Sequence, residues 1–289
     1  MKLVDQREKA LHYLQGNQSP LIFLMGPCAI ESEAHVMRMA EFLTNLAEKL
    51  KFTLVFKAAF DKANRTSLNG ARGLGIEKGS EILRRVKSEF QVPIVTDVHE
   101  VAQIEKIVGF ASVIQIPAFL CRQTDLLIAA GQTNKVIHIK KGQFLAPQNM
   151  EGALKKVQST GNESVWLCER GYAFGYGDLI VDYRGFGIMK SFGKPVIFDA
   201  THSVQKPGAF VQPGATECSS GGERKFVADL AISAVAQGIA GVFMEVHNEP
   251  EKAICDGPNS IRLSQLEELV KYLIDLDAWT KERKKPEVF

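Results

Sequence analysis

Short apolar runs recur along the chain, and almost every run ends at a polar residue of a kind that can take part in chemistry. The runs are rich in Val, Ile, Leu and Phe, as expected of strands covered on both faces. The runs, each with the polar residue that it reaches, are 21–25 with Cys28, 53–56 with Lys57, 93–96 with Asp97, 112–114 with Gln115, 135–139 with Lys140, 164–169 with Arg170, 195–201 with His202 and 241–244 with Glu245.

Between the runs, apolar residues fall at three- and four-residue spacing, which is typical of helices with one buried face. Ser32 is the expected N-cap of the clearest helix. Strand and helix therefore alternate eight times, which predicts a single (β/α)8 TIM barrel over residues 1–289, with residues 1–20 as a short N-terminal cap. The expected helices are 31–51, 77–90, 100–108, 122–133, 149–159, 182–192, 224–238 and 260–278.

In such a barrel, the C-terminal strand ends and the loops after them meet at one mouth, so the polar residues at the run ends form one site. Two connections are longer than this fold usually needs. Residues 62–76 carry Asn-Arg-Thr-Ser and several glycines, and residues 203–223 read as a long structureless stretch. Because both connections follow strands, we expect both to lie over the mouth, where long loops often act as lids.

Composition narrows the class of protein. With 45% hydrophobic residues, 24% charged residues and a net charge of +2, the chain reads as an ordinary cytoplasmic protein without the basic stripe of a nucleic-acid binder. No apolar stretch approaches the roughly 20 residues that span a bilayer, so we expect no membrane partner. The cysteines are scattered and odd in number, which predicts reduced thiols rather than a disulfide framework. They are Cys28, Cys121, Cys168, Cys218 and Cys255.

A metal site is the sharpest local hypothesis. Cys28, His202 and Glu245 each follow a run, and Asp256 lies in the loop after the last run. A thiolate, an imidazole and two carboxylates would suit Zn, Fe or Mn. The spacing contains no compact ligand motif, so the alternative is a buried cysteine, a hydrogen-bonded histidine and two solvated carboxylates.

The mouth is also expected to be cationic. Five converging cations would repel one another without an anion, which favours a doubly charged or phosphorylated substrate over a solvated rim. Asp97, Gln115 and His202 could move protons or orient a hydroxyl, although Asp97 could equally be a structural carboxylate that holds a lysine. His138, inside a run, reads as a hydrogen-bonded core histidine. The five cations are Lys57, Lys62, Arg65, Lys140 and Arg170.

Read together, these segments closely resemble the 3-deoxy-D-manno-octulosonate 8-phosphate synthases. That family, whose fold is a (β/α)8 barrel, condenses phosphoenolpyruvate with D-arabinose 5-phosphate in the biosynthesis of lipopolysaccharide KDO. The resemblance runs from about residue 23 to residue 263. The motifs that carry it are Gly-Pro-Cys-Ala-Ile-Glu-Ser (26–32), Phe-Lys-Ala-Ala-Phe-Asp-Lys-Ala-Asn-Arg-Thr-Ser (56–67), Thr-Asp-Val-His-Glu (96–100), Gln-Ile-Pro-Ala-Phe-Leu-Cys-Arg-Gln-Thr-Asp (115–125) and Phe-Asp-Ala-Thr-His-Ser-Val-Gln (198–205).

The resemblance assigns roles to individual residues. Asn64, Arg65 and Thr66 look like the grip on arabinose 5-phosphate, with Thr66 where most relatives have Ser. Arg122 resembles a residue that the family donates from a neighbouring subunit, which implies a homotetramer. Gln115 and Gln205 lie within the motifs and join the substrate-binding set. The residues that look like the phosphoenolpyruvate site are Lys57, Lys62, Lys140 and Arg170, with the backbone around Ala118.

The family has a metal-dependent branch with Cys, and a metal-independent branch with Asn, at the position of Cys28. The set Cys28, His202, Glu245 and Asp256 therefore matches the complete metal site. The segment Cys255-Asp256-Gly257-Pro258 looks instead like the metal-independent branch. The resemblance thus implies a bound divalent metal and leaves open whether that metal is strictly required.

Two competing readings remain. The related 3-deoxy-D-arabino-heptulosonate 7-phosphate synthases use erythrose 4-phosphate and carry Lys-Pro-Arg-Thr-Ser, whereas residues 62–67 here read Lys-Ala-Asn-Arg-Thr-Ser. The additional Asn64 favours the longer sugar. The other reading is a catalytically silent barrel that binds a sugar phosphate, which the complete set of polar residues at the run ends disfavours.

Overall fold

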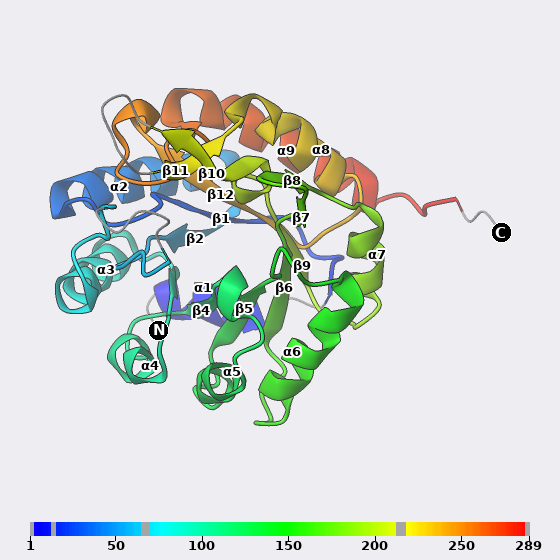
Figure 1. Cartoon of the computed structure of the whole chain (residues 1–289), viewed down its shortest axis with the longest axis horizontal. Helices are drawn as coiled ribbons and strands as arrows, with labels where there is room; N and C mark the ends of the chain where they lie inside the picture. Colours follow the sequence, from blue (N-terminus) through cyan, green and yellow to red (C-terminus); the bar gives the residue numbers. More distant parts are fainter. Residues whose placement is uncertain (1–2, 13–15, 65–69, 212–217, 287–289) are drawn as a thin grey trace.

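In the computed structural model, parallel strands close into an eight-stranded barrel with helices around it, which confirms the predicted fold class (Figure 1). The structure describes residues 3–12, 16–64, 70–211 and 218–286. Pairing of the first and last barrel strands closes the ring, with Phe23 opposite Val242. The barrel strands, in their order around the ring, are β1 (Ile22–Gly26), β2 (Thr53–Lys57), β3 (Ile94–Asp97), β4 (Val113–Ile116), β5 (Val136–Lys140), β6 (Val165–Glu169), β9 (Val196–Asp199) and β12 (Gly241–His247).

The helices around the barrel occupy the predicted segments, with shifted ends. Ser32 caps α2, since its hydroxyl accepts from the backbone N–H of His35 at 3.2 Å. The last helix starts later than predicted because Ile261–Arg262 forms β13, which pairs with β12. Within the described residues, no helix is long and apolar enough to cross a membrane. The helices are α2 (Glu33–Leu50), α3 (Ile76–Phe90), α4 (Val101–Ile107), α5 (Thr124–Gly131), α6 (Met150–Gln158), α7 (Arg184–Lys190), α8 (Val227–Val235) and α9 (Leu263–Lys281).

Alternate strand residues separate into two apolar clusters. One cluster fills the barrel interior and includes Leu24, Val95 and Trp166. The other lies between the strands and the surrounding helices and includes Phe23 and Phe56. Because side chains alternate along a strand, both faces of each strand are apolar, which explains the nearly continuous hydrophobic runs.

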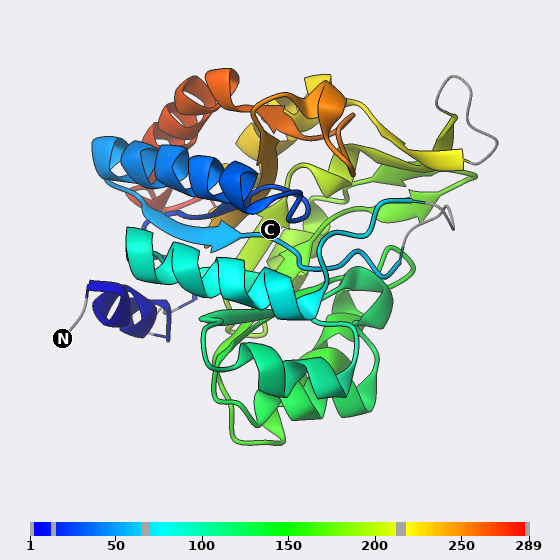
Figure 2. The same cartoon turned by 90° about the vertical axis from the view of Figure 1, so that its left-hand side faces the viewer.

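Helix α1 (Leu3–His12) lies at the N-terminal ends of the strands. Leu11 joins the cluster inside the barrel, and Glu8 accepts a hydrogen bond from the hydroxyl of Ser112, directly before β4. Arg7 donates to the carbonyl oxygen of Gln91 at 3.0 Å. Figure 2 shows α1 at one end of the molecule and the yellow hairpin segment at the opposite end.

The segment 203–223 is not structureless, and this expectation was wrong. It forms an antiparallel hairpin of β10 (Gln205–Val211) and β11 (Cys218–Gly222), with an irregular register between Lys206 and Phe210. Pro207 and the glycines concealed the strand alternation. A second hairpin that the sequence did not predict, β7 (Tyr172–Phe174) and β8 (Asp178–Ile180), follows β6.

Candidate active site

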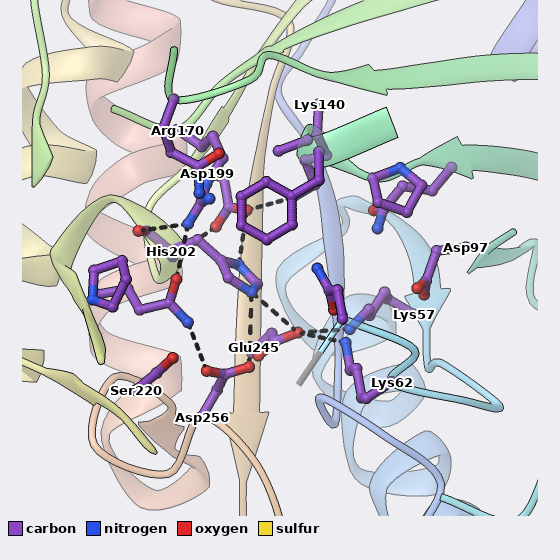
Figure 3. A pocket seen from close by; sticks show the side chains of 18 residues that line it. Lys57, Lys62, Asp97, Lys140, Arg170, Asp199, His202, Ser220, Glu245 and Asp256 are labelled. Atoms are coloured by element: carbon purple, nitrogen blue, oxygen red, sulfur yellow. Dashed lines mark hydrogen bonds and ion pairs between the residues drawn. The ribbon is translucent and has the colours of Figure 1, made fainter. Parts of the chain in front are cut away.

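The C-terminal ends of the strands surround a polar cavity of about 150 Å³ (Figure 3). The ends of β2, β3, β4, β5, β6, β9 and β12 each bring at least one polar residue into it, as the run pattern predicted for all the runs except the first. The cavity also has lining residues that were not singled out from the sequence, among them Phe119, Gln143, Asp199 and Ser220. The predicted site residues that line it are Lys57, Lys62, Asn64, Asp97, Gln115, Ala118, Lys140, Arg170, His202, Gln205, Glu245 and Asp256.

The remaining predicted residues lie elsewhere. Cys28 follows β1 and lies behind Asp256 rather than in the cavity lining. Arg122 is exposed and does not line the cavity. Arg65 and Thr66 lie outside the described residues. Of the three residues expected to bind the sugar phosphate, the structure therefore places only Asn64.

Buried cations line the cavity from several strand ends, and together we call them the cationic wall. Lys57, Lys140 and Arg170 expose 1%, 4% and 5% of their surface, and they come from the ends of β2, β5 and β6. Arg170 donates through Nη2 to Gln205 Oε1 at 3.0 Å, while its Nε has no partner within the described structure. A buried N–H donor without a partner is costly, and an anionic ligand would satisfy it. The wall is therefore suited to holding an anion away from bulk water.

Glu245 partly neutralises this wall. Its Oε1 lies 2.6 Å from Nζ of Lys57 and 3.7 Å from Nζ of Lys62. Burial lowers the pKa of Lys57 from 10.5 to about 8 even with that partner present. Burial would raise the pKa of Glu245, but the charges of Lys57, His202 and Lys62 lower it to about 2. Glu245 is thus ionised at neutral pH. Lys57, whose pKa is lowered, loses its proton more readily than Lys62, whose pKa is raised.

Asp199, the last residue of β9, ties Lys140 to His202. Its Oδ2 binds the ammonium of Lys140 and lies 2.8 Å from Nδ1 of His202. Its other oxygen accepts from the backbone N–H of His202 at 2.9 Å. Burial would raise the pKa of Asp199, but these cations hold it well below its ordinary value. Sequence reasoning missed Asp199 because the predicted run extended to residue 201, although the rule that strand ends carry chemistry would have found it.

Asp97 pairs with a histidine rather than directly with a lysine. Nε2 of His99 lies 3.1 Å from Oδ2 of Asp97, while Oδ1 is buried without a partner within the described structure. Burial alone would raise the pKa of Asp97, but the charge of Lys62 and the bond to His99 keep it well below its ordinary value. Asp97 therefore presents an ionised carboxylate oxygen beside the cavity, which a substrate hydroxyl or water can approach.

His202, Glu245 and Asp256 are arranged as metal ligands. Nε2 of His202 lies 3.7 Å from Glu245 Oε1 and 3.9 Å from Asp256 Oδ2. One ligand atom from each residue falls within 4.8 Å of the others. Glu245 Oε2 is buried and has no partner within the described structure, which leaves a carboxylate oxygen free for a cation. Because Asp199 orients the far nitrogen of His202, this set resembles the carboxylate–histidine–metal arrangement of many proteins, and it fits a divalent ion.

Cys28 is not a free thiol in this structure, so the expectation that every cysteine is reduced was wrong. It forms a disulfide with Cys255, 227 residues away in sequence. Its Sγ also lies 3.1 Å from Asp256 Oδ2, so reduced Cys28 would complete the ligand set. Counting and spacing could not reveal the pair, since only the closure of the barrel brings the loop after β12 beside the loop after β1.

A second titratable cluster, Glu31, His35 and His247, fastens the same two loops together. Nε2 of His247 lies 3.1 Å from Glu31 Oε1, and its Nδ1 accepts from the backbone N–H of Glu249 at 2.9 Å. His247 therefore carries its proton on Nε2 and donates it to Glu31. Both nitrogens of His247 are thus engaged, which makes this cluster a structural contact beside the site.

His138 is buried in the barrel below the cavity, as expected, but the expected hydrogen bond is missing. Neither ring nitrogen has a partner within the described structure, and the ring packs against Phe243 and Trp166. Burial holds its pKa well below 6.5. His138 is accordingly a neutral core group.

The fold and the cavity define the class of protein, a (β/α)8 barrel whose mouth is lined by buried cations. A profile of the DAHP synthetase I family matches residues 3–282. The chain belongs to this family, which confirms the resemblance drawn from its motifs. Curated relatives named 2-dehydro-3-deoxyphosphooctonate aldolase are similar over nearly their whole length. That of Geotalea daltonii is 52% identical over 266 residues, 92% of this chain and 96% of the relative, and those of Pelobacter propionicus and Geobacter sulfurreducens are 53% and 50% identical with the same coverage.

Proposed function

We propose that this chain condenses phosphoenolpyruvate with D-arabinose 5-phosphate and water, giving 3-deoxy-D-manno-octulosonate 8-phosphate and inorganic phosphate. The observation that carries the proposal is one shared cavity, into which separate strands bring Lys57, Lys140, Arg170 and the carboxylates that pair with the two lysines. The names of the relatives agree with this reaction, which would make the chain a transferase of lipopolysaccharide KDO biosynthesis. A silent binding protein would not need the ionised Asp97 beside the anion wall.

The wall residues have distinct tasks in this proposal. Lys57, Lys62, Lys140 and Arg170, with the backbone at Ala118, hold the phosphate and carboxylate of phosphoenolpyruvate. Their fixed charges offset the substrate's charge without reorganising water. Asn64, with Arg65 and Thr66, holds the sugar phosphate, while Gln115 and Gln205 orient polar groups between the two substrates. Bound in this way, the two carbon atoms that react are held next to each other.

The reaction joins C3 of phosphoenolpyruvate to the aldehyde carbon of the sugar. Water supplies the new oxygen at C2, and the bond between C2 and the phosphate oxygen breaks. One proton of the water passes to the aldehyde oxygen, carried by Asp97 or His202, and the other leaves with phosphate. The β10–β11 hairpin borders the cavity through Pro207 and Ser220, so its closure would keep further water from the reacting carbons.

We also propose a divalent metal, Zn, Fe or Mn, held by His202, Glu245, Asp256 and reduced Cys28. When bound, such an ion would orient or polarise water or the aldehyde. Gln205 holds one of these ligands in place, since its Nε2 donates to Asp256 Oδ1 at 2.8 Å.

The proposal includes a homotetramer in which Arg122 reaches the sugar phosphate of a neighbouring subunit. Arg122 is exposed beside the mouth, in the segment between β4 and α5, and does not enter its own cavity. Its backbone carbonyl accepts from Nζ of Lys156 at 2.8 Å, which holds the segment against α6. An exposed, anchored arginine is available to a second copy of the chain.

The test is phosphate release from phosphoenolpyruvate with each of two aldehydes. We expect rapid release with arabinose 5-phosphate and little with erythrose 4-phosphate. Lys140→Ala should abolish release while leaving the circular dichroism spectrum unchanged, and the exposed Lys155→Ala is the matched control. Preference for erythrose 4-phosphate would show that the proposed sugar substrate is wrong. Near-normal turnover of Lys140→Ala would show that the cationic wall does not bind phosphoenolpyruvate as proposed.

A further inference from the structure

A second buried ion pair lies directly behind the cationic wall, between Lys141 and Glu169. Nζ of Lys141 lies 3.4 Å from Glu169 Oε1, and both side chains are completely buried. Neither residue lines the cavity. Each, however, is the sequence neighbour of a wall residue, since Lys141 follows Lys140 and Glu169 precedes Arg170.

Glu169 holds the backbone of the arginine. Its Oε1 accepts from the N–H of Arg170 at 2.9 Å and from the N–H of Gly171 at 2.6 Å. Gly171 has φ +91°, a conformation that favours glycine, so the chain turns sharply there. The carboxylate thereby fixes the direction in which the Arg170 side chain leaves the end of β6.

Lys141 holds the facing loop. Its ammonium lies 3.1 Å from the carbonyl oxygen of Gly171, 3.4 Å from that of Gly142 and 3.5 Å from that of Leu145. It also lies 3.5 Å from the ring centre of Tyr172. Gly142 and Leu145 flank Gln143, whose side chain lines the cavity and whose buried Oε1 has no partner among the described residues. One ammonium thus joins the loop after β5 to the turn after β6.

Burial makes this arrangement hard to explain as a source of stability. When two charges are buried, the hydration free energy that they lose can exceed the free energy gained from their attraction. A buried ion pair is therefore weak evidence that the pair stabilises the fold. Glu169 Oε2 and the hydroxyl of Tyr172 are in addition buried without partners within the described structure. What the pair does provide is a fixed geometry for three cavity residues: Lys140, Gln143 and Arg170.

We propose that Lys141 and Glu169 are positioning residues for the phosphoenolpyruvate site, acting through Arg170 and Gln143 without touching substrate. The inference rests on the proposed function. It assigns the affinity for phosphoenolpyruvate in part to a charge pair outside the cavity, while the affinity for the sugar phosphate depends on the opposite side of the mouth.

The test compares Lys141→Met, Glu169→Met and Glu169→Gln by calorimetric binding of phosphoenolpyruvate and by steady-state kinetics. Lys141→Met and Glu169→Met should each raise the KM for phosphoenolpyruvate at least tenfold, on the order of losing one charged hydrogen bond, with the KM for arabinose 5-phosphate within twofold. Glu169→Gln keeps an acceptor oxygen for the two N–H groups, so it should recover most of the affinity lost in Glu169→Met. If Lys141→Met fails to fold, the two Glu169 variants decide alone.

Two controls separate positioning from stability. Val270→Ala creates a cavity in the core, away from the mouth, and should lower the melting temperature without changing either KM. Lys155→Met removes one partner of the exposed pair with Glu151 and should change nothing. The inference is overturned if the buried-pair variants bind phosphoenolpyruvate as the unaltered chain does, or if their losses merely follow melting temperature. Failure of the unaltered chain to bind phosphoenolpyruvate would instead contradict the proposed function, and this inference with it.

Discussion

The imidazole of His202 is tied to Asp199, with Nδ1 of the histidine 2.8 Å from Oδ2 of the aspartate. The same oxygen binds the ammonium of Lys140. One buried carboxylate thus orients a candidate metal ligand and a candidate substrate-binding group through the same oxygen. Because Asp199 is 0% exposed, its charge acts at close to full strength on both.

Asp199→Asn should lower kcat strongly. The amide keeps the size of the side chain but removes the charge that holds Lys140 and the tautomer of His202, so we expect a loss of roughly 10²- to 10⁴-fold. Initial-rate measurements with both substrates saturating give the answer, with the exposed Asp275→Asn as control. A rate within twofold of the unaltered chain would show that Asp199 orients nothing that the reaction needs.

The pH dependence of kcat/KM for phosphoenolpyruvate should report Lys57. With its pKa lowered to about 8 by burial, Lys57 loses its charge well below the ordinary lysine value of 10.5. Since kcat/KM reflects groups of the free enzyme, it should fall as the pH rises through about 8. A profile that stays flat to pH 10, checked against enzyme stability at each pH, would contradict this assignment.

Acid should destabilise the fold partly through Glu245. Its pKa is about 2 in the folded chain and 4.5 ordinarily, so in that window the unfolded chain binds more protons. The contribution of Glu245 to the free energy of unfolding is therefore fully present above pH 4.5, and it is lost as the pH falls towards 2. Urea unfolding between pH 6 and pH 3 should show a shallower decline for Glu245→Gln than for Glu268→Gln, an exposed control. Equal slopes would mean that Glu245 is not held ionised by the wall.

Metal binding should depend on the state of Cys28. In the disulfide with Cys255, its sulfur is not a thiolate, so we expect weaker binding of Zn or Mn before reduction than after it. Cys255→Ser leaves Cys28 free and should bind metal equally with and without reductant. Calorimetry after chelator treatment measures both affinities, and phosphate release before and after metal addition shows whether the metal is required. An affinity unchanged in Cys28→Ser would remove the cysteine from the ligand set.

The barrel was predictable because its strands are covered on both faces, which leaves an apolar signal in every run. Most of the cavity followed from one geometric rule, that strand ends meet. At β9 the predicted run ended two residues too late, at Thr201 instead of Asp199, so the rule was applied to His202 and Asp199 was missed.

The sequence could not predict the pairs of residues that form through contacts between distant loops. Cys28 and Cys255, or Lys141 and Glu169, become partners only when the barrel closes, and no local periodicity marks either pair. The β10–β11 hairpin was missed for another reason, since Pro207 and the glycines there read as loop residues. Local patterns therefore predicted the strands and the cavity, while the groups that hold the cavity in shape emerged only from the tertiary structure.

The most direct test of the central claim is a competition for limiting phosphoenolpyruvate between equal amounts of arabinose 5-phosphate and erythrose 4-phosphate, with the product identified by mass spectrometry. The account predicts the eight-carbon 3-deoxy-2-ulosonate phosphate as the dominant product, with one inorganic phosphate released per product formed. A dominant seven-carbon product, or binding of both substrates without release of phosphate, would contradict it.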